Sequence, residues 1–223
     1  FMSSNVTYKY IRQNPDIHTY IKNADAAVAV QGYTEHSFTH VEKVAETVKM
    51  ILEGLGCDER KVELGMIAAY MHDIGNVINR IDHAQSGAVM AFRLLDNLNM
   101  PAEEICDIIS AIGNHDEGTA QPLNAITAAL IIADKTDVRR SRVRNINALA
   151  NDIHDRVNFA VERSELAFNE DKTELILELT IDNRISSVME YFEIFMNRMI
   201  LCKKSAEFLG VRFRIRANGS DLV

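Results

Sequence analysis

The chain has 223 residues, 47% of them hydrophobic and 25% charged, which is the composition of an ordinary globular protein. Its 24 basic and 32 acidic residues give a net charge of −8, and this sign argues against general nucleic-acid binding. We expect neither a signal segment nor a membrane anchor, since no apolar run approaches the roughly 18 residues of a membrane span. Three widely spaced cysteines without a C-x-x-C pair favour free, mostly buried thiols and a cytoplasmic location.

Apolar residues recur at helical spacing through the first part of the chain. Asn14 and Pro15 fit the N-cap and first position of the first predicted helix, which Gly32 closes. The segment 59–73 is apolar on nearly all sides, so we expect it at the centre of the bundle, with Gly75 as its C′ residue. The other helices are predicted at about 40–55, 83–98, 101–112 and 123–139.

After residue 155, the spacing of apolar residues changes from helical to a mixture of strand and helix. Val157–Val161 and Leu175–Ile181 read as strands, residues 184–209 as a long amphipathic helix, and Val211–Arg216 as a third strand. We therefore predict a mainly α fold made of two parts. These are a helical domain over 1–155 and a small β-β-α-β subdomain over 156–223, with antiparallel strands and one long helix.

Polar residues of metal-ligand type interrupt three of the predicted helices. His72 and Asp73 end the central helix, where both face a high desolvation cost unless they are paired or bound to metal. Asp134 follows the apolar run 125–133 and points inward, and a buried carboxylate needs a cation or several donors. His40 lies on the inward stripe of its helix. A core histidine, a buried Asp–Arg pair or a helix cap would explain each residue singly, but not all of them together.

The order of these residues resembles the HD superfamily of metal-dependent phosphohydrolases. His40, the run MHDIG at 71–75 and the run ADKTD at 133–137 carry the resemblance, which covers about residues 33–140. It implies an all-helical HD-domain bundle with a metal ion bound by four side chains. They are His40, His72, Asp73 and Asp134, of which His72 and Asp73 are the expected catalytic residues.

Two more histidines fit the subset of this superfamily that has a two-metal site. His83 opens a predicted helix in a stretch similar to the H-x-x-x-G-A of those members, and His115 follows the next helix. By this resemblance, Asp73 bridges two ions, with His83 and His115 on the second. His36 is expected behind the ligands or outside the site. Imidazole and carboxylate ligands suit one or two divalent ions of Fe, Mn, Co, Ni or Zn.

This sequence lacks the signature of one subclass of the superfamily. Cyclic-dinucleotide phosphodiesterases of that subclass have paired histidines and a Gly-Tyr-Pro run, whereas residues 114–123 read NHDEGTAQPL. We therefore do not expect that activity. Residues 155–223 lie beyond the resemblance.

Basic residues follow Asp134. Guanidinium groups bind phosphate oxygens in a bidentate manner, so this run is the candidate substrate-binding region. If the helix continues, Arg139 lies about 7.5 Å from Asp134 along its axis. The alternative is a solvated helix end that balances the helix dipole. The predicted substrate-binding residues are Lys135, Arg139, Arg140 and Arg142.

The expected function is hydrolysis of a phosphomonoester or phosphodiester by a metal-activated water. The partner is then a small phosphorylated molecule, nucleotide-like or other. Two alternatives stay open: a diiron oxygenase, because some HD-fold members use a similar ligand set to activate dioxygen, and a nucleotide-binding signalling module with little catalysis. The sequence leaves homo-oligomerisation open.

Overall fold

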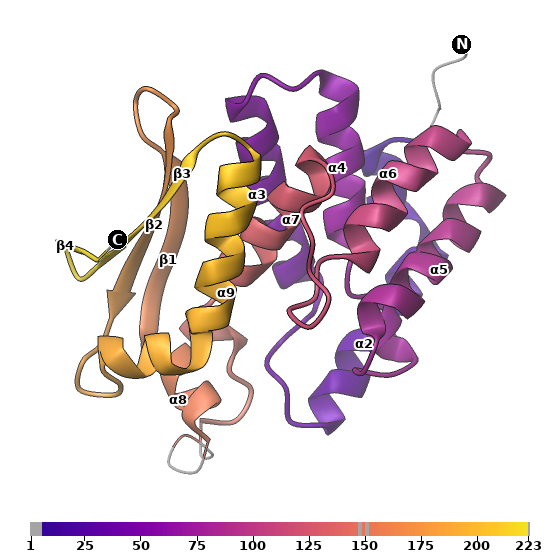
Figure 1. The fold of residues 1–223 in the computed structure, drawn as a ribbon. Helices are drawn as coiled ribbons and strands as arrows, with labels where there is room; N and C mark the ends of the chain where they lie inside the picture. The colour runs from indigo at the N-terminus through magenta and orange to yellow at the C-terminus, as the bar shows by residue number, and fades with distance from the viewer. Residues whose placement is uncertain (1–5, 147–148, 150–151, 223) are drawn as a thin grey trace.

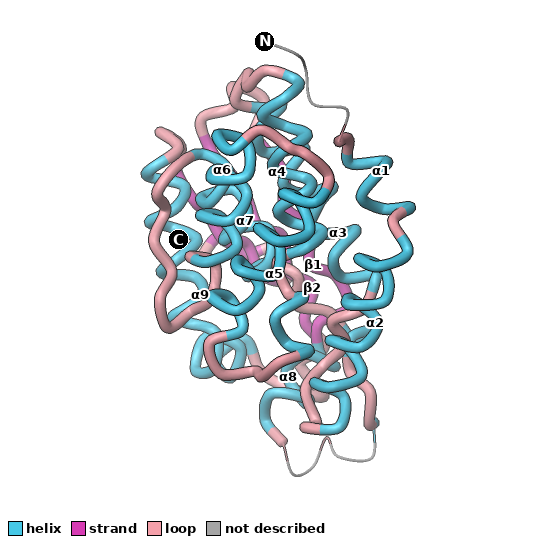
Figure 2. The backbone as a smooth tube through the Cα atoms, turned by 90° about the vertical axis from the view of Figure 1, so that its right-hand side faces the viewer, coloured by secondary structure: helices cyan, strands magenta, loops and turns pink. Residues whose placement is uncertain are grey.

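The computed structural model describes residues 6–146, 149 and 152–222. A helical bundle forms one side of the molecule, and a sheet with a long helix forms the other (Figure 1). Seen from the side of α5 and α6, the strands lie behind the bundle (Figure 2). A single cluster of buried apolar side chains includes residues of both parts.

The bundle contains seven of the helices described, and its centre is the helix that the sequence predicts there. Every residue from Leu64 to Met71 is buried, because this helix packs against four others. The bundle helices are α1 (Tyr8–Gln13), α2 (Pro15–Val30), α3 (Phe38–Gly54), α4 (Glu59–Met71), α5 (His83–Asn97), α6 (Ala102–Gly113) and α7 (Ala125–Thr136), with short 3-10 turns η1 (Ile74–Val77) and η2 (Arg140–Arg142).

Side-chain caps fix where several helices begin. The Asn14 side chain accepts hydrogen bonds from two backbone N–H groups of α2, with Pro15 in the first turn, as predicted. Asp58 caps α4 and Asn124 caps α7 in the same way. These caps fix the residues at which α4 and α7 begin.

Helix α7 is shorter than predicted. The sequence suggests a helix to residue 139, but α7 ends at Thr136, because Asp137 leaves the helical conformation at φ −82° and ψ 68°. The Asp137 carboxylate turns instead toward His40 and Arg139, at 2.8 Å from each. Arg139 therefore does not lie on a continuing helix beside Asp134.

Gly75 is not a C′ residue, which corrects a second expectation. Helix α4 ends at Met71 with His72 as its C-cap, and Gly75 lies within η1. A Cβ at this position would stand 2.0 Å from the carbonyl oxygen of His83 and 2.5 Å from the nitrogen of Gly87. Glycine is needed here because the backbones of η1 and α5 approach each other closely.

The second part begins with a helix where a strand was expected. Residues Val157–Val161 were predicted as a strand, but α8 (Ile153–Ala160) forms there, with its first turn capped by Asp152. Val157, the β-branched residue of this stretch that lies in α8, is fully buried, so tertiary packing overrides its local preference for a strand. After α8 come β1 (Val161–Phe168), β2 (Glu174–Ile181), α9 (Val188–Phe208), β3 (Arg212–Ala217) and β4 (Ser220–Asp221).

The four strands form one sheet in the order β1-β2-β3-β4. The β1–β2 and β3–β4 pairs are antiparallel, but β2 and β3 are parallel, so the expectation of antiparallel strands is only partly correct. The parallel pair follows from α9, which carries the chain back to the other end of the sheet and packs against β3 and α7. Register pairs Glu174 with Arg212 and Glu178 with Arg216, and both pairs form ion pairs.

The absence of a membrane span and the burial of the cysteines were also predicted from the sequence. Within the described ranges, no helix combines the length and the apolar character needed to cross a bilayer. The three cysteines are free thiols, but only Cys202 is buried and Cys106 is exposed, so the expectation of mostly buried thiols is wrong.

Candidate metal centre

Six predicted ligands converge at the heart of the bundle. They come from separate elements, so none of the helices forms the centre alone. All four of the histidines are buried. His40 belongs to α3, His72 and Asp73 follow α4, His83 opens α5, His115 follows α6 and Asp134 lies near the end of α7.

The Asp73 carboxylate lies between two pairs of histidines. Its Oδ2 atom is 3.3 Å from Nε2 of His72 and 3.8 Å from Nε2 of His40. Its Oδ1 atom is 3.4 Å from Nε2 of His83 and 3.8 Å from Nε2 of His115. Each oxygen thus faces a different pair of imidazoles, as a carboxylate bridging two ions would.

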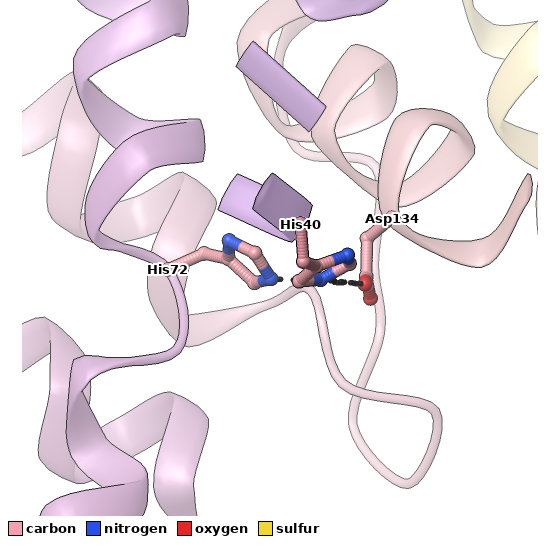
Figure 3. Close-up of side chains that lie close together, drawn as sticks. All are labelled: His40, His72 and Asp134. Carbon is pink, nitrogen blue, oxygen red and sulfur yellow. Dashed lines mark ion pairs between the residues drawn. The ribbon is translucent and has the colours of Figure 1, made fainter. Parts of the chain in front are cut away.

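Two groups of side chains here could hold a metal ion. In the first, Asp134 Oδ1 lies 3.3 Å from Nε2 of His40 and 3.6 Å from Nε2 of His72 (Figure 3). The second consists of His72, Asp73 and His115. These separations are long for hydrogen bonds, but they suit atoms that share an ion bound about 2.0–2.1 Å from each.

The hydrogen bonds of the imidazole rings turn Nε2 toward the centre. In His72, His83 and His115, Nδ1 donates to the backbone carbonyl three residues earlier, at 2.7, 3.0 and 2.6 Å. In His40, Nδ1 donates to Asp137 Oδ2 at 2.8 Å. Since these oxygens accept, Nδ1 carries the proton and leaves the Nε2 lone pair for a ligand, the usual arrangement around metals.

Two ring nitrogens lack the partner that burial demands. Among the described residues, Nε2 of His40 and Nε2 of His72 are buried and have no hydrogen-bond partner. An unsatisfied buried polar atom is costly and rare. A metal ion between these nitrogens and the carboxylates would satisfy both, so the residues fit the group that the sequence implies.

Charges in the centre shift the pKa values of its members. Burial opposes ionisation, but His72 lowers the pKa of Asp73 and Lys135 lowers that of Asp134, in both cases well below the usual range. Burial also opposes a charged His72 ring, but the Asp73 and Asp134 carboxylates outweigh it and raise the pKa of His72 to about 10.

A cavity of about 410 Å³ opens beside this centre. Two of the four predicted substrate-binding residues line it. Lys135 is buried, with Nζ 2.7 Å from Asp134 Oδ2. Arg142 is also buried and donates to the carbonyl oxygens of Glu35 and Asp137 at 2.8 and 2.7 Å.

The other two predicted substrate-binding residues are not among those that line the cavity. Arg139 donates to Asp137 at 2.8 Å and to Ser141 at 2.6 Å. Arg140 donates to the carbonyl oxygen of Phe159 at 2.7 Å and lies over the ring of the same residue. These two guanidinium groups therefore have partners outside the cavity wall.

Other residues of the cavity wall were not singled out from the sequence. Arg80 lies 3.3 Å from Nε2 of His83 and 4.0 Å from Oδ1 of Asp73, and its place three residues before His83 was an available signal. Arg198 of α9 pairs with Glu117 at 2.5 Å, and nothing in its amphipathic helix indicates this. His36 also lines the cavity, and burial lowers its pKa well below the ordinary value.

Comparisons with known proteins identify the family of the central part of the chain. Residues 37–139 match the model of the HD domain family, so this stretch of the chain is an HD domain and the resemblance seen in the sequence is confirmed. An uncharacterized protein of Methanocaldococcus jannaschii is 26% identical in an alignment 199 residues long that covers 79% of this chain and 76% of that protein. A crystal structure of a predicted HD superfamily hydrolase from an uncultured Thermotogales bacterium has 24% identity and a TM-score of 0.44, over 56% of this chain and 67% of that one.

Proposed function

We propose that the protein is a metal-dependent hydrolase of small phosphate esters. The observation that carries this proposal is the Asp73 carboxylate, whose two oxygens face two different pairs of Nε2 atoms. A buried carboxylate among four imidazoles that all present Nε2 is a ligand set for divalent transition metals such as Fe, Mn, Co, Ni or Zn.

The ligands divide naturally between two ions. One ion would be held by His40, His72, Asp73 and Asp134, and the other by Asp73, His83 and His115. A divalent ion bound here supplies an activated water and polarises a phosphoryl oxygen. The protein's own task is to fix the ligands, which the Nδ1 hydrogen bonds and the backbone of η1 accomplish.

Positive side chains around the cavity favour a phosphate over dioxygen as the substrate. Lys135, Arg80, Arg142 and Arg198 line a single cavity in a chain whose net charge is −8. Lys135 and Arg80 contact the ligand carboxylates themselves, so they lie where phosphoryl oxygens would bind. These charges would not strengthen the binding of dioxygen, which is neutral, whereas each of them would strengthen the binding of a phosphate dianion.

The test joins metal analysis to hydrolysis assays. We expect the wild-type protein to carry transition metal and to hydrolyse p-nitrophenyl phosphate or bis(p-nitrophenyl) phosphate. Asp73→Asn should lose most of the metal and the activity, while the matched control Asp96→Asn, an exposed carboxylate on α5, should lose neither. A metal-loaded wild type that hydrolyses no ester of a broad panel would overturn the proposal, and dioxygen consumption by it would indicate the oxygenase.

A further inference from the structure

Helix α8 contributes two buried polar side chains to the cavity wall. Asp155 is 9% exposed and Asn158, three residues further on the same helix, is 7% exposed; both line the cavity beside the metal centre. Helix α8 lies at the lower end of the molecule, outside residues 37–139 that match the HD domain (Figure 1). This wall is therefore a feature of the chain's second part.

Both side chains keep hydrogen-bond acceptors without a donor. Among the residues that the structure describes, the Asp155 carboxylate accepts no hydrogen bond and forms no ion pair. Asn158 uses its Nδ2 group to donate to the His154 carbonyl oxygen at 2.8 Å, and its Oδ1 atom has no donor among the same residues. The oxygens of neither side chain are among the fully buried atoms that lack a partner, so they are open to the cavity that both residues line, and burial together with Asp152 raises the pKa of Asp155.

Two neighbouring residues of the cavity wall, Asp152 and Arg198, have other partners. Asp152 is occupied as the N-cap of α8, where its Oδ1 atom accepts from the backbone N–H of His154 at 2.7 Å. Arg198 lies on the same cavity wall, but its guanidinium pairs with Glu117 at 2.5 Å and covers the ring of Phe195. One free carboxylate does not make a metal site, so the unused acceptors point to donors on a bound molecule.

The cavity thus has two chemically different regions. Near the metal ligands, Lys135 and Arg80 supply positive charge for a phosphate group. On α8, the Asp155 carboxylate and the Asn158 Oδ1 atom supply acceptors. A volume of about 410 Å³ exceeds what a phosphate group alone needs, and it is typical of a site for a small organic molecule.

We propose that Asp155 and Asn158 bind hydrogen-bond-donating groups, hydroxyl or amino, on the organic part of the phosphate ester substrate. The inference rests on the proposed function for the phosphate end of the molecule. It makes α8 the element that determines specificity, whereas the HD domain supplies the metal ligands.

Binding and hydrolysis are measured with two matched pairs of ligands. Ribose phosphate is compared with deoxyribose phosphate for hydroxyl donors, and aminobutyl phosphate with pentyl phosphate for an amino donor. In calorimetry on the metal-loaded wild type, we expect the donor-rich member of at least one pair to bind about tenfold more tightly, as one hydrogen bond to a charged group provides. The pair that discriminates identifies the donor.

Variants then assign the preference to α8. Asp155→Asn and Asn158→Ala should each remove most of it, while binding of pentyl phosphate and the metal content stay unchanged. Glu162→Gln is the matched control, because Glu162 is a nearby exposed carboxylate that is not among the residues lining the cavity. Thermal melting shows whether either variant has a folding defect. If one has, the other variant still tests the proposal.

The outcomes separate this inference from the proposed function. Equal binding within both pairs by the wild type, or an undiminished preference in both variants, overturns the role of α8 even if the protein hydrolyses p-nitrophenyl phosphate. A preference that depends on Asp155 in a protein without hydrolytic activity supports the role of α8 and contradicts the proposed function.

Discussion

His40 donates from Nδ1 to the Asp137 carboxylate at 2.8 Å, across 97 positions of the chain. The same carboxylate is held by Lys43 at 3.2 Å and by Arg139 at 2.8 Å, so it is itself fixed in place. Asp137 is therefore a positioning residue, since it sets the tautomer of His40 and aims Nε2 at the centre.

Replacing this carboxylate should weaken metal binding without removing a ligand. We expect Asp137→Asn to lower metal affinity by about 10- to 100-fold, the usual cost of losing such a partner. Competition with a chromogenic chelator measures the affinity, and Asp96→Asn serves as the control. Wild-type affinity in Asp137→Asn would mean that the His40 ring is held by packing alone.

Removing the metal should destabilise the fold, because an ion that binds only the assembled ligands shifts the equilibrium toward the native state. A ligand present at 100 times its Kd stabilises the native state by about 2.7 kcal/mol. Thermal melts before and after chelation should therefore differ by several degrees, and adding metal back should restore the loss. His72→Ala, which lacks a central ligand, should show a smaller difference between the two conditions.

Gly75→Ala should be among the most damaging single substitutions in the chain. The new Cβ would meet backbone atoms of His83 and Gly87 rather than a flexible side chain, so η1 and α5 must separate. We expect a loss of about 3 kcal/mol or more in the free energy of unfolding, at the upper end of overpacking effects. Gly118→Ala, where a Cβ would stand 3.9 Å from Oδ2 of Asp116, should be nearly neutral in the same denaturant titration.

The start of α9 should give the protein an acid-sensitive component of stability. Hydrogen bonds from Ser187 N–H and the Ser186 hydroxyl, with Arg156, lower the pKa of Glu190 to about 2. A lowered pKa in the folded state means that the contribution is complete above the ordinary value of 4.5 and disappears as the pH falls toward 2.

Glu190→Gln should therefore be less stable than the wild type at neutral pH, and this difference should shrink on acidification through the same range. Glu193→Gln, an exposed position one turn further along α9, is the control. Urea titrations at several pH values measure both variants. A difference that is independent of pH would assign the Glu190 effect to packing instead of charge.

Arginines on and off the cavity wall should differ in their effect on catalysis. We expect Arg80→Ala to raise KM by about 10- to 100-fold with less change in kcat, as for a charge-assisted contact made in both the ground and transition states. Arg140→Ala should leave both constants unchanged, because Arg140 packs over Phe159 and is not among the cavity-lining residues. Equal effects of the two substitutions would contradict this assignment.

Local patterns predict the bundle, whereas the six candidate ligands that the fold brings together were named mainly by the resemblance to the HD superfamily. Helical periodicity points His40 and Asp134 inward and places His72 and Asp73 at the end of a buried helix, but His83 and His115 rest on the resemblance alone. Asp137 and Asp155 were not identified, because their contacts depend on how α7 ends and on where α8 packs, which neighbouring residues do not reveal. For the same reason the parallel pairing of β2 and β3 was not predicted, since it depends on the path of α9.

The ligands of the centre are spread from residue 40 to residue 134, on five helices or their ends. The departure of α3, α5, α6 or α7 from the bundle therefore removes at least one candidate ligand. A metal ion bound in the centre would therefore suppress the separate fluctuations of these helices and leave mainly the cooperative ones. In hydrogen exchange, loading the metal should slow the amides of all these helices together, by similar factors, instead of protecting only those beside the ligands.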